Sequence, residues 1–168
     1  MSEPLAERMR PQTLDEYVGQ QHLVGEGAVL RRMLESGRIP SFILWGPPGV
    51  GKTTLARIVA RQLKVPFYTL SAVTSGVKEV REVIERAKNS SFFNTTSPIL
   101  FIDEIHRFSK SQQDTLLGAV EHGTVTLIGA TTENPSFEVI RPLLSRCQVY
   151  VLKPLGKQDL QRLLERAI

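Results

Sequence analysis

Short apolar segments alternate along the chain with longer segments in which apolar residues recur at helical spacing. The short segments are residues 42–45, 67–70, 99–102, 125–128 and 148–152. Helical spacing occurs at residues 27–36, 52–60, 77–87 and 109–121, then up to about residue 144, and again in the last residues. Because strands that alternate with helices form βαβ units, this order predicts a parallel sheet sandwiched by helices, a three-layer α/β/α fold.

Length and composition predict a globular protein with one well-buried core. The chain has 168 residues, of which 41% are hydrophobic and 23% are charged, and these are ordinary values for a globular domain. No apolar run approaches the roughly 20 residues of a membrane span, and the first residues do not resemble a signal peptide. We therefore expect a cytoplasmic protein without a membrane partner.

Cysteine, histidine and net charge add little to this picture. Cys147 is the single cysteine, and the three histidines do not have metal-ligand spacing, so neither a disulfide nor a zinc site is indicated. The formal net charge of +4 permits contact with nucleic acid without establishing it. Charge alone does not identify a partner.

Residues 42–54 contain the clearest functional motif. An apolar strand leads into the pattern Gly-x-x-x-x-Gly-Lys-Thr, and a helical segment follows directly. Glycines in such a turn let backbone N–H groups approach a phosphate, while the lysine reaches the β- and γ-phosphates and the next hydroxyl ligates Mg²⁺. The predicted nucleotide-binding residues are Gly46, Pro47, Pro48, Gly49, Val50, Gly51, Lys52, Thr53 and Thr54. The strand, spacing and helix together disfavour a chance Gly/Pro turn, so the motif predicts binding of a nucleoside triphosphate.

Two carboxylates follow the third apolar segment. Asp103 stands where a second acidic group is needed to hold Mg²⁺ together with Thr53, usually through water. Glu104 is the candidate to orient or deprotonate an attacking water. The alternative is an acidic turn at the end of a strand. Because the C-terminal ends of parallel strands meet at one edge of a sheet, we expect Lys52, Asp103 and Thr132 to converge.

Two further residues have roles that the local sequence leaves open. Thr132 follows an apolar segment together with Thr131, and a hydroxyl there could bond a phosphate or the lytic water; the alternative is β-propensity followed by a turn. Arg146 precedes the last strand and could serve a neighbouring subunit as an arginine finger, or simply be solvated. Spacing does not choose between these alternatives.

The order of the motifs resembles that of an AAA+ ATPase of the clamp-loader clade. Gly-Pro-Pro-Gly-Val-Gly-Lys-Thr-Thr is similar to Walker A, Phe-Ile-Asp-Glu to Walker B, Ile-Gly-Ala-Thr-Thr-Glu-Asn to sensor 1 and Ser-Arg-Cys to the arginine-finger motif. Four longer blocks, at residues 5–11, 45–48, 103–114 and 131–137, resemble the replication-associated recombination protein A family, and that resemblance covers essentially the whole chain.

The resemblance implies roles for individual residues. ATP and Mg²⁺ would be the ligands, and Lys52 and Glu104 would be catalytic. Thr132 would be sensor 1, and Arg146 would be the finger that acts in trans. The arm that precedes the core would flank the adenine through Arg8, Tyr17, Val18 and Gly19.

The resemblance also implies a domain organisation and a biological role. It predicts an N-terminal arm at residues 1–25, an AAA+ ATPase core at 26–155 and the start of a truncated helical lid at 156–168. The family contains DNA-stimulated ATPases of stalled replication forks and of single-strand/duplex junctions and ends, partnered by single-stranded-DNA-binding protein at the nucleoid. We expect a homo-oligomer in the larger protein. This chain alone, without the oligomerisation domain, is expected to be monomeric and nearly inactive.

Rival functions come from the same clade and from another class. A clamp-loader subunit or a Holliday-junction motor would act on a sliding clamp or a junction, and an interaction module would bind nucleotide without hydrolysing it. Glu104 argues against the last of these. Helices that follow strand ends face DNA in the clamp-loader relatives, and the alternative is a solvated charged face. The candidate DNA contacts are Lys78, Arg81, Arg107 and Lys110.

Overall fold

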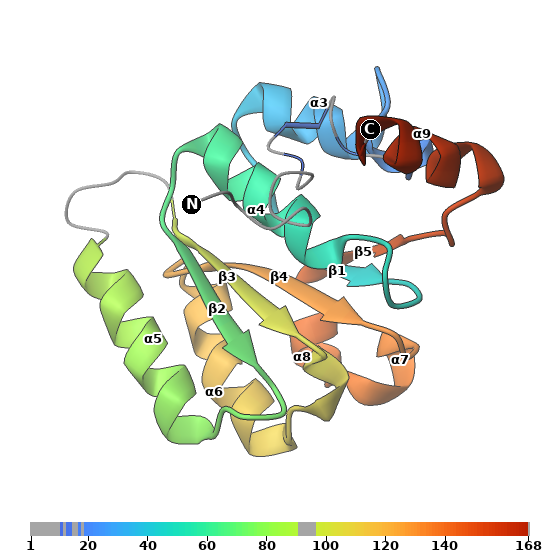
Figure 1. The fold of residues 1–168 in the computed structure, drawn as a ribbon. Helices are drawn as coiled ribbons and strands as arrows, with labels where there is room; N and C mark the ends of the chain where they lie inside the picture. Colours follow the sequence, from blue (N-terminus) through green and yellow to red (C-terminus); the bar gives the residue numbers. More distant parts are fainter. Residues whose placement is uncertain (1–10, 12, 15–16, 18, 91–96, 168) are drawn as a thin grey trace, which may run out of the picture.

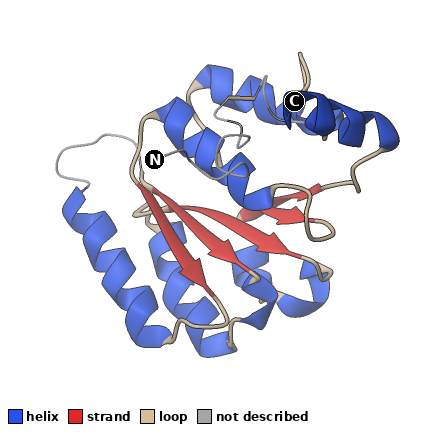
Figure 2. Cartoon of the chain, viewed as in Figure 1, coloured by secondary structure: helices blue, strands red, loops and turns tan. Residues whose placement is uncertain are grey.

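A parallel sheet forms the central layer of the molecule (Figure 1, Figure 2). The structure is a computed structural model that describes residues 11, 13, 14, 17, 19–90 and 97–167. Within these residues the strands are β1 (Ser41–Trp45), β2 (Phe67–Ser71), β3 (Ile99–Asp103), β4 (Thr126–Thr131) and β5 (Cys147–Val151). They lie in the order β2-β3-β4-β1-β5, and every pairing is parallel. This confirms the predicted α/β/α class.

Helices cover both faces of this sheet, as Figure 1 shows. One layer contains α3 (Val29–Ser36) and α4 (Lys52–Leu63), and the other contains α5 (Val77–Ser90), α6 (Lys110–Glu121) and α8 (Arg141–Leu144). The other helices among the described residues are α2 (Gln21–Val24), the 3-10 helix η1 (Ile105–Arg107), α7 (Pro135–Glu138) and α9 (Lys157–Ala167). None of the helices in the described part of the chain is long and apolar enough to cross a membrane.

The sheet separates two apolar clusters. Phe42 and Leu44 of β1 belong to the cluster under α3 and α4, whereas Ile43 between them belongs to the cluster under α5 and α6. Successive side chains of a strand point to opposite faces, and all three of these are fully buried. Burial on both faces explains why the strands read as continuous apolar runs rather than as alternating patterns.

Helix ends follow local sequence signals. The Ser109 side chain accepts the backbone N–H of Gln112, and the Gln112 side chain accepts the N–H of Ser109, so a capping box starts α6. Gly37 has a φ of 77° and ends α3 as predicted. The capping box matters for function, because it determines where α6 begins after the two carboxylates.

Four local expectations differ from the structure. The stretch expected to be one helix up to residue 144 is two short helices, because Val139 and Ile140 are extended and Pro142 lies in the first turn of the second one, which begins at Arg141. Helix α5 runs three residues beyond the predicted end at residue 87. The arm, predicted to lack regular structure, contains the single turn α2. Val29, predicted to be core, is 40% exposed because it is the first residue of α3.

Candidate functional site

The loop between β1 and α4 requires glycine at two positions, at one because a neighbouring segment is too close and at the other because of its backbone conformation. A Cβ on Gly46 would lie 2.7 Å from the Leu152 Cβ and 2.9 Å from the Leu152 carbonyl oxygen. Gly51 has a φ of 88°, in the left-handed region that glycine adopts without steric cost, and it is the N-cap of α4. The Gly46 N–H also donates to the Thr131 carbonyl oxygen at 3.1 Å. The loop is therefore held against both neighbours of β1 and leads directly into a helix N-terminus.

Lys52, the first residue of α4, folds back over this loop. Its Nζ donates to the carbonyl oxygens of Gly46 at 2.6 Å and Pro47 at 3.0 Å. Partial burial lowers the pKa of Lys52, and the carboxylates of Asp103 and Glu104 oppose that shift. An ammonium has three donors on a flexible stem, so it can exchange these carbonyls for phosphate oxygens.

A pocket of about 340 Å³ lies where β1, β3 and β4 end. It is lined by Pro48, Gly49, Gly51, Lys52, Thr53, Thr54, Asp103, Glu104, Thr131 and Thr132. The structure thus brings Lys52, Asp103 and Thr132 together, as the parallel topology requires. Gly46, Pro47 and Val50, which were also predicted at the nucleotide, lie outside this lining, and Gly46 and Val50 are buried.

The donors in this pocket fit Mg²⁺ bound with water and phosphate. Thr53 and Asp103 are both exposed to the pocket and offer a hydroxyl and a carboxylate, the hard oxygen donors that Mg²⁺ prefers. Within the described residues, no group of three or more His, Cys, Asp or Glu side chains could enclose a metal. Mg²⁺ usually keeps several waters and takes only one or two carboxylates, so two protein donors suffice.

Glu104 has an unusual backbone conformation next to Asp103. Its φ is 53°, a left-handed conformation that costs a non-glycine residue roughly 1–2 kcal/mol. Glu104 directly precedes η1, and its carboxylate lies 3.6 Å from the Nε of Arg107 in that helix. Strained residues of this kind are common at functional sites. Arg107, predicted as a DNA contact, is therefore also a neighbour of the candidate catalytic carboxylate.

The two threonines at the end of β4 differ in environment. Thr131 is 1% exposed, and its Oγ1 accepts the Glu133 N–H at 2.9 Å. The same Oγ1 lies 2.9 Å from Nδ1 of His106 in η1. Thr132 is exposed at the pocket. Thr131 thus connects β4 to η1, and Thr132 is the hydroxyl available to a ligand.

His106 is a residue whose importance sequence reasoning missed. It was considered only as a metal ligand, for which its spacing is unsuitable. The structure places it two residues after Glu104 and against the strand that carries Thr132, so it links the two candidate catalytic segments. A sequence signal was available in part, because a histidine just after the two carboxylates must lie near the strand ends.

Arg146 makes an ion pair within its own chain. Its guanidinium lies 3.7 Å from the carboxylate of Glu121 at the end of α6, and both side chains are more than a third exposed. An exposed pair of this kind contributes little to stability, about 0–1 kcal/mol. The pair can therefore open at low cost, which leaves Arg146 available to another partner.

The described part of the arm packs on the loop between β1 and α4 and beside β5. The Tyr17 hydroxyl donates to the carbonyl oxygens of Val50 at 2.7 Å and Gly51 at 3.0 Å. The Gln20 side chain makes two hydrogen bonds with the backbone of Lys153, as a neighbouring strand would. Gly19 faces the chain beyond β5, since a Cβ there would lie 2.8 Å from Leu155. Of the predicted adenine contacts, Arg8 and Val18 lie outside the described residues.

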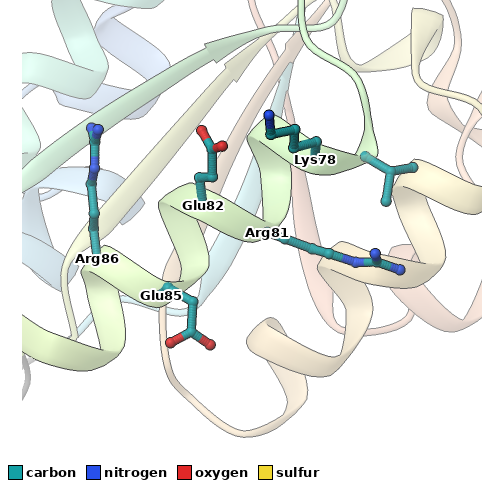
Figure 3. Close-up of a pocket in the computed structure, with 6 residues that line it drawn as sticks. Lys78, Arg81, Glu82, Glu85 and Arg86 are labelled. Carbon is teal, nitrogen blue, oxygen red and sulfur yellow. The ribbon is translucent and has the colours of Figure 1, made fainter.

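The predicted DNA contacts on α5 lie on a face of mixed charge (Figure 3). This face is hollowed and is lined by Val77, Lys78, Arg81, Glu82, Glu85 and Arg86. Figure 3 shows Lys78, Glu82 and Arg86 pointing to one side of α5 and Arg81 and Glu85 pointing to the other. Each row contains acidic and basic side chains, so the basic residues do not form a continuous patch. Lys110 is exposed at the start of α6.

Comparison with known proteins supports the motif analysis. The model of the family described as "ATPase family associated with various cellular activities (AAA)" matches residues 42–155. Replication-associated recombination protein A of Escherichia coli is 55% identical over 166 residues, which covers 99% of this chain and 37% of that protein. The protein of the same name from Coxiella burnetii is 55% identical over 165 residues, with coverages of 98% and 37%. The resemblance predicted from the motifs is thus confirmed, although the chain spans little more than a third of these relatives.

A solved structure of related fold comes from Thermotoga maritima. Its RuvB Holliday junction branch migration motor matches with a TM-score of 0.76 and 30% sequence identity. The match covers 94% of this chain and 53% of that chain. It supports the same three-layer architecture independently of the family model.

Proposed function

We propose that this chain, which belongs to the AAA family of ATPases, is the ATP-hydrolysing core of a protein that acts on DNA during replication and recombination. One observation carries the proposal. Lys52, Thr53, Asp103, Glu104 and Thr132 line a single pocket at the ends of parallel strands, next to a glycine loop that opens a helix. Each of these groups suits one requirement of phosphoryl transfer.

Lys52 and the loop backbone bind the phosphates. Lys52 exchanges its carbonyl partners for phosphate oxygens, and the start of α4 adds the positive end of a helix dipole. Thr53 and Asp103 hold Mg²⁺, which when bound neutralises charge on the β- and γ-phosphates. We also propose that the chain divides into three parts, an arm (1–25), a core (26–155) and a lid that starts at residue 156. The arm residues Tyr17 and Gly19 lie on the nucleotide side of the core.

Glu104 and Thr132 act on the water that attacks the γ-phosphate. The Glu104 carboxylate accepts a proton from that water, and the Thr132 hydroxyl orients the water or the phosphate. Arg107 Nε lies 3.6 Å from the Glu104 carboxylate, so the guanidinium stands beside the candidate base. A module that only bound nucleotide would not need a carboxylate at this position.

Arg146 completes the site of a neighbouring subunit in a homo-oligomer. It directly precedes β5, the edge strand beside β1, and its pair with Glu121 is exposed and weak. When the oligomer forms, the Arg146 guanidinium leaves Glu121 and contacts the γ-phosphate of the ATP bound to the next subunit. Loss of an arginine finger costs about 10³–10⁵ in rate in related phosphoryl transfers, so an isolated subunit hydrolyses ATP slowly.

The partners proposed are DNA at single-strand/duplex junctions and single-stranded-DNA-binding protein, in the cytoplasm at the nucleoid. The names of the relatives from Escherichia coli and Coxiella burnetii, which refer to replication and recombination, support a DNA-related role. The basic residues of α5 and Lys110 are the candidate contacts, although Glu82 and Glu85 lie among them. A DNA site on this face would have to place phosphates beside Lys78 and Arg81 and away from those carboxylates.

Phosphate release in the presence of defined DNA structures tests this proposal. The assay uses the longest natural polypeptide that contains these 168 residues. It compares hydrolysis without DNA, with a forked duplex that has a single-stranded arm, with a blunt duplex and with a four-way junction. We expect the fork to stimulate hydrolysis most. Selective stimulation by the four-way junction would instead indicate a Holliday-junction motor. No hydrolysis under any condition would indicate a nucleotide-binding interaction module.

A further inference from the structure

The Tyr17 hydroxyl contacts the phosphate-binding loop from its buried side. Tyr17 is 5% exposed and packs in the same apolar cluster as Val50 and Leu55. Its single hydroxyl hydrogen is shared between the carbonyl oxygens of Val50 and Gly51, at 2.7 and 3.0 Å. Burial raises the pKa of Tyr17, so the hydroxyl keeps its proton and remains a donor.

These contacts orient two peptide planes of the loop. The Val50–Gly51 and Gly51–Lys52 peptides are trans, and the C=O and N–H of a trans peptide point in opposite directions. When the carbonyls of Val50 and Gly51 point toward Tyr17, the N–H groups of Gly51 and Lys52 must point away from it. Gly51 and Lys52 line the pocket, and Tyr17 does not. The Gly51 carbonyl also accepts the Leu55 N–H at 2.9 Å, so α4 holds the Gly51–Lys52 plane as well. The hydroxyl therefore directs the Gly51 N–H toward the pocket side of the loop and acts together with α4 on the Lys52 N–H.

The Tyr17 ring also restricts Gly51 sterically. A Cβ on Gly51 would lie 3.0 Å from the Tyr17 Oη and 3.2 Å from its Cε2, so the ring lies directly against the Gly51 backbone. Glycine has the greatest conformational freedom of any residue, and a free loop would lose that freedom on binding an anion. Contact with the Tyr17 ring and hydroxyl removes much of this conformational freedom before the ligand binds, so the loop is preorganised for the anion.

We propose that Tyr17 is a positioning residue for phosphate binding, whose hydroxyl holds the N–H of Gly51, and together with α4 that of Lys52, toward the β-phosphate of a bound nucleoside di- or triphosphate. This inference rests on the proposed function, because it takes the pocket to be the nucleotide site. It differs from the adenine-flanking role that the family resemblance implies for Tyr17. The hydroxyl acts on the phosphates through the backbone and does not touch the ligand.

Tyr17→Phe tests the proposal, because it removes only the hydroxyl. Tyr150→Phe is a matched control, since Tyr150 is 9% exposed in the same cluster and its hydroxyl contacts the Met33 sulfur at 3.4 Å. Dissociation constants for ADP and AMP are measured by calorimetry on the 168-residue chain. We expect Tyr17→Phe to weaken ADP binding about ten-fold, the effect of about one hydrogen bond, and to leave AMP binding unchanged. Tyr150→Phe should leave both unchanged.

The comparison of ADP with AMP separates positioning from general support of the fold. Equal weakening of both nucleotides would overturn the proposal in favour of a structural or adenine-directed role, and unchanged ADP affinity would overturn it outright. A wild-type chain that bound neither nucleotide would contradict the proposed function instead.

A second measurement, on the nucleotide-free chain, keeps the proposal testable in that case. NMR order parameters of the Gly51 and Lys52 amides should be near the value of about 0.85 for rigid backbone in the wild type. The Gly51 value should fall toward the flexible range, below about 0.6, in Tyr17→Phe and stay high in Tyr150→Phe. The Lys52 value should fall less, because the Leu55 N–H still bonds the Gly51 carbonyl. Unchanged order parameters in Tyr17→Phe would show that the hydroxyl does not hold these amides.

Discussion

Gln113 offers a direct test of how α6 is joined to the helices that precede β5. Its side chain is 3% exposed, which is rare for a glutamine. The amide nitrogen donates to the carbonyl oxygens of Phe108 and Glu138, each at 3.1 Å, and the amide oxygen accepts the Ile140 N–H at 2.8 Å. One side chain thus satisfies three backbone groups from the segment before α6 and from the residues at and just after the end of α7.

Gln113→Leu keeps the approximate size of the side chain and removes all three hydrogen bonds. Each buried backbone group left without a partner costs about 1–3 kcal/mol, with the lower value where water can enter. The Phe108 bond is fully buried, and those of Glu138 and Ile140 are partly buried. The sum is about 3–5 kcal/mol, and greater burial of apolar surface by leucine returns about 1 kcal/mol. We expect a net loss of about 2–4 kcal/mol, a large share of a typical total of about 5–15 kcal/mol.

Urea unfolding of the nucleotide-free chain measures this loss. Gln62→Leu is the matched control, because Gln62 is exposed on α4 and the same substitution there should change stability by no more than about 0.5 kcal/mol. The midpoint should fall for Gln113→Leu while the denaturant dependence stays constant. A loss below about 1 kcal/mol would refute the claim that these hydrogen bonds hold α6 to the segment between α7 and α8.

Three further outcomes follow from the site. Glu104→Gln should leave ATP affinity largely intact and reduce hydrolysis on the order of 10²-fold or more, as single-turnover kinetics can measure; near-normal turnover would refute the assignment of the base. Thr131→Val removes the buried hydroxyl that links β4 to η1, and steady-state kinetics should show a lower kcat with little change in KM; a raised KM alone would place its effect on binding. Replacing Lys78, Arg81 and Lys110 with alanine should weaken DNA binding and reduce its salt dependence by about one unit of slope per lost phosphate contact, whereas an unchanged slope would place the DNA elsewhere.

The sheet and the set of residues in the pocket follow from the sequence for clear physical reasons. Strands buried on both faces must be apolar throughout, which makes segments such as 99–102 easy to recognise. Parallel strands share the direction of their C-terminal ends, so the polar groups that follow each strand must meet there. Convergence of Lys52, Asp103 and Thr132 was predictable without knowledge of any side-chain contact.

The long-range contacts that hold the elements around the site in place were not predictable in the same way. The Tyr17 hydroxyl reaches backbone 33 and 34 residues away, and His106 meets Thr131 across 25 residues. Such pairs depend on rotamers and on the exact separation of elements, which leave no periodic pattern in the sequence. The break between α7 and α8 has a partial signal in Pro142, but the Gln113 contact to Ile140 that accompanies it comes from another helix.

ATP binding by the wild-type chain and two variants tests the central claim most directly, that the pocket beside the β1–α4 loop is the nucleotide site. Calorimetry with Mg²⁺ and ATP is performed on the wild-type chain, on Lys52→Ala and on Glu104→Gln. We predict saturable binding at one site per chain in the wild type, a similar affinity in Glu104→Gln and a large loss of affinity in Lys52→Ala. Of the two substituted residues, Lys52 is assigned to the phosphates and Glu104 to the attacking water. Equal affinity in the wild type and Lys52→Ala would contradict the account, because ATP would then bind somewhere other than this pocket.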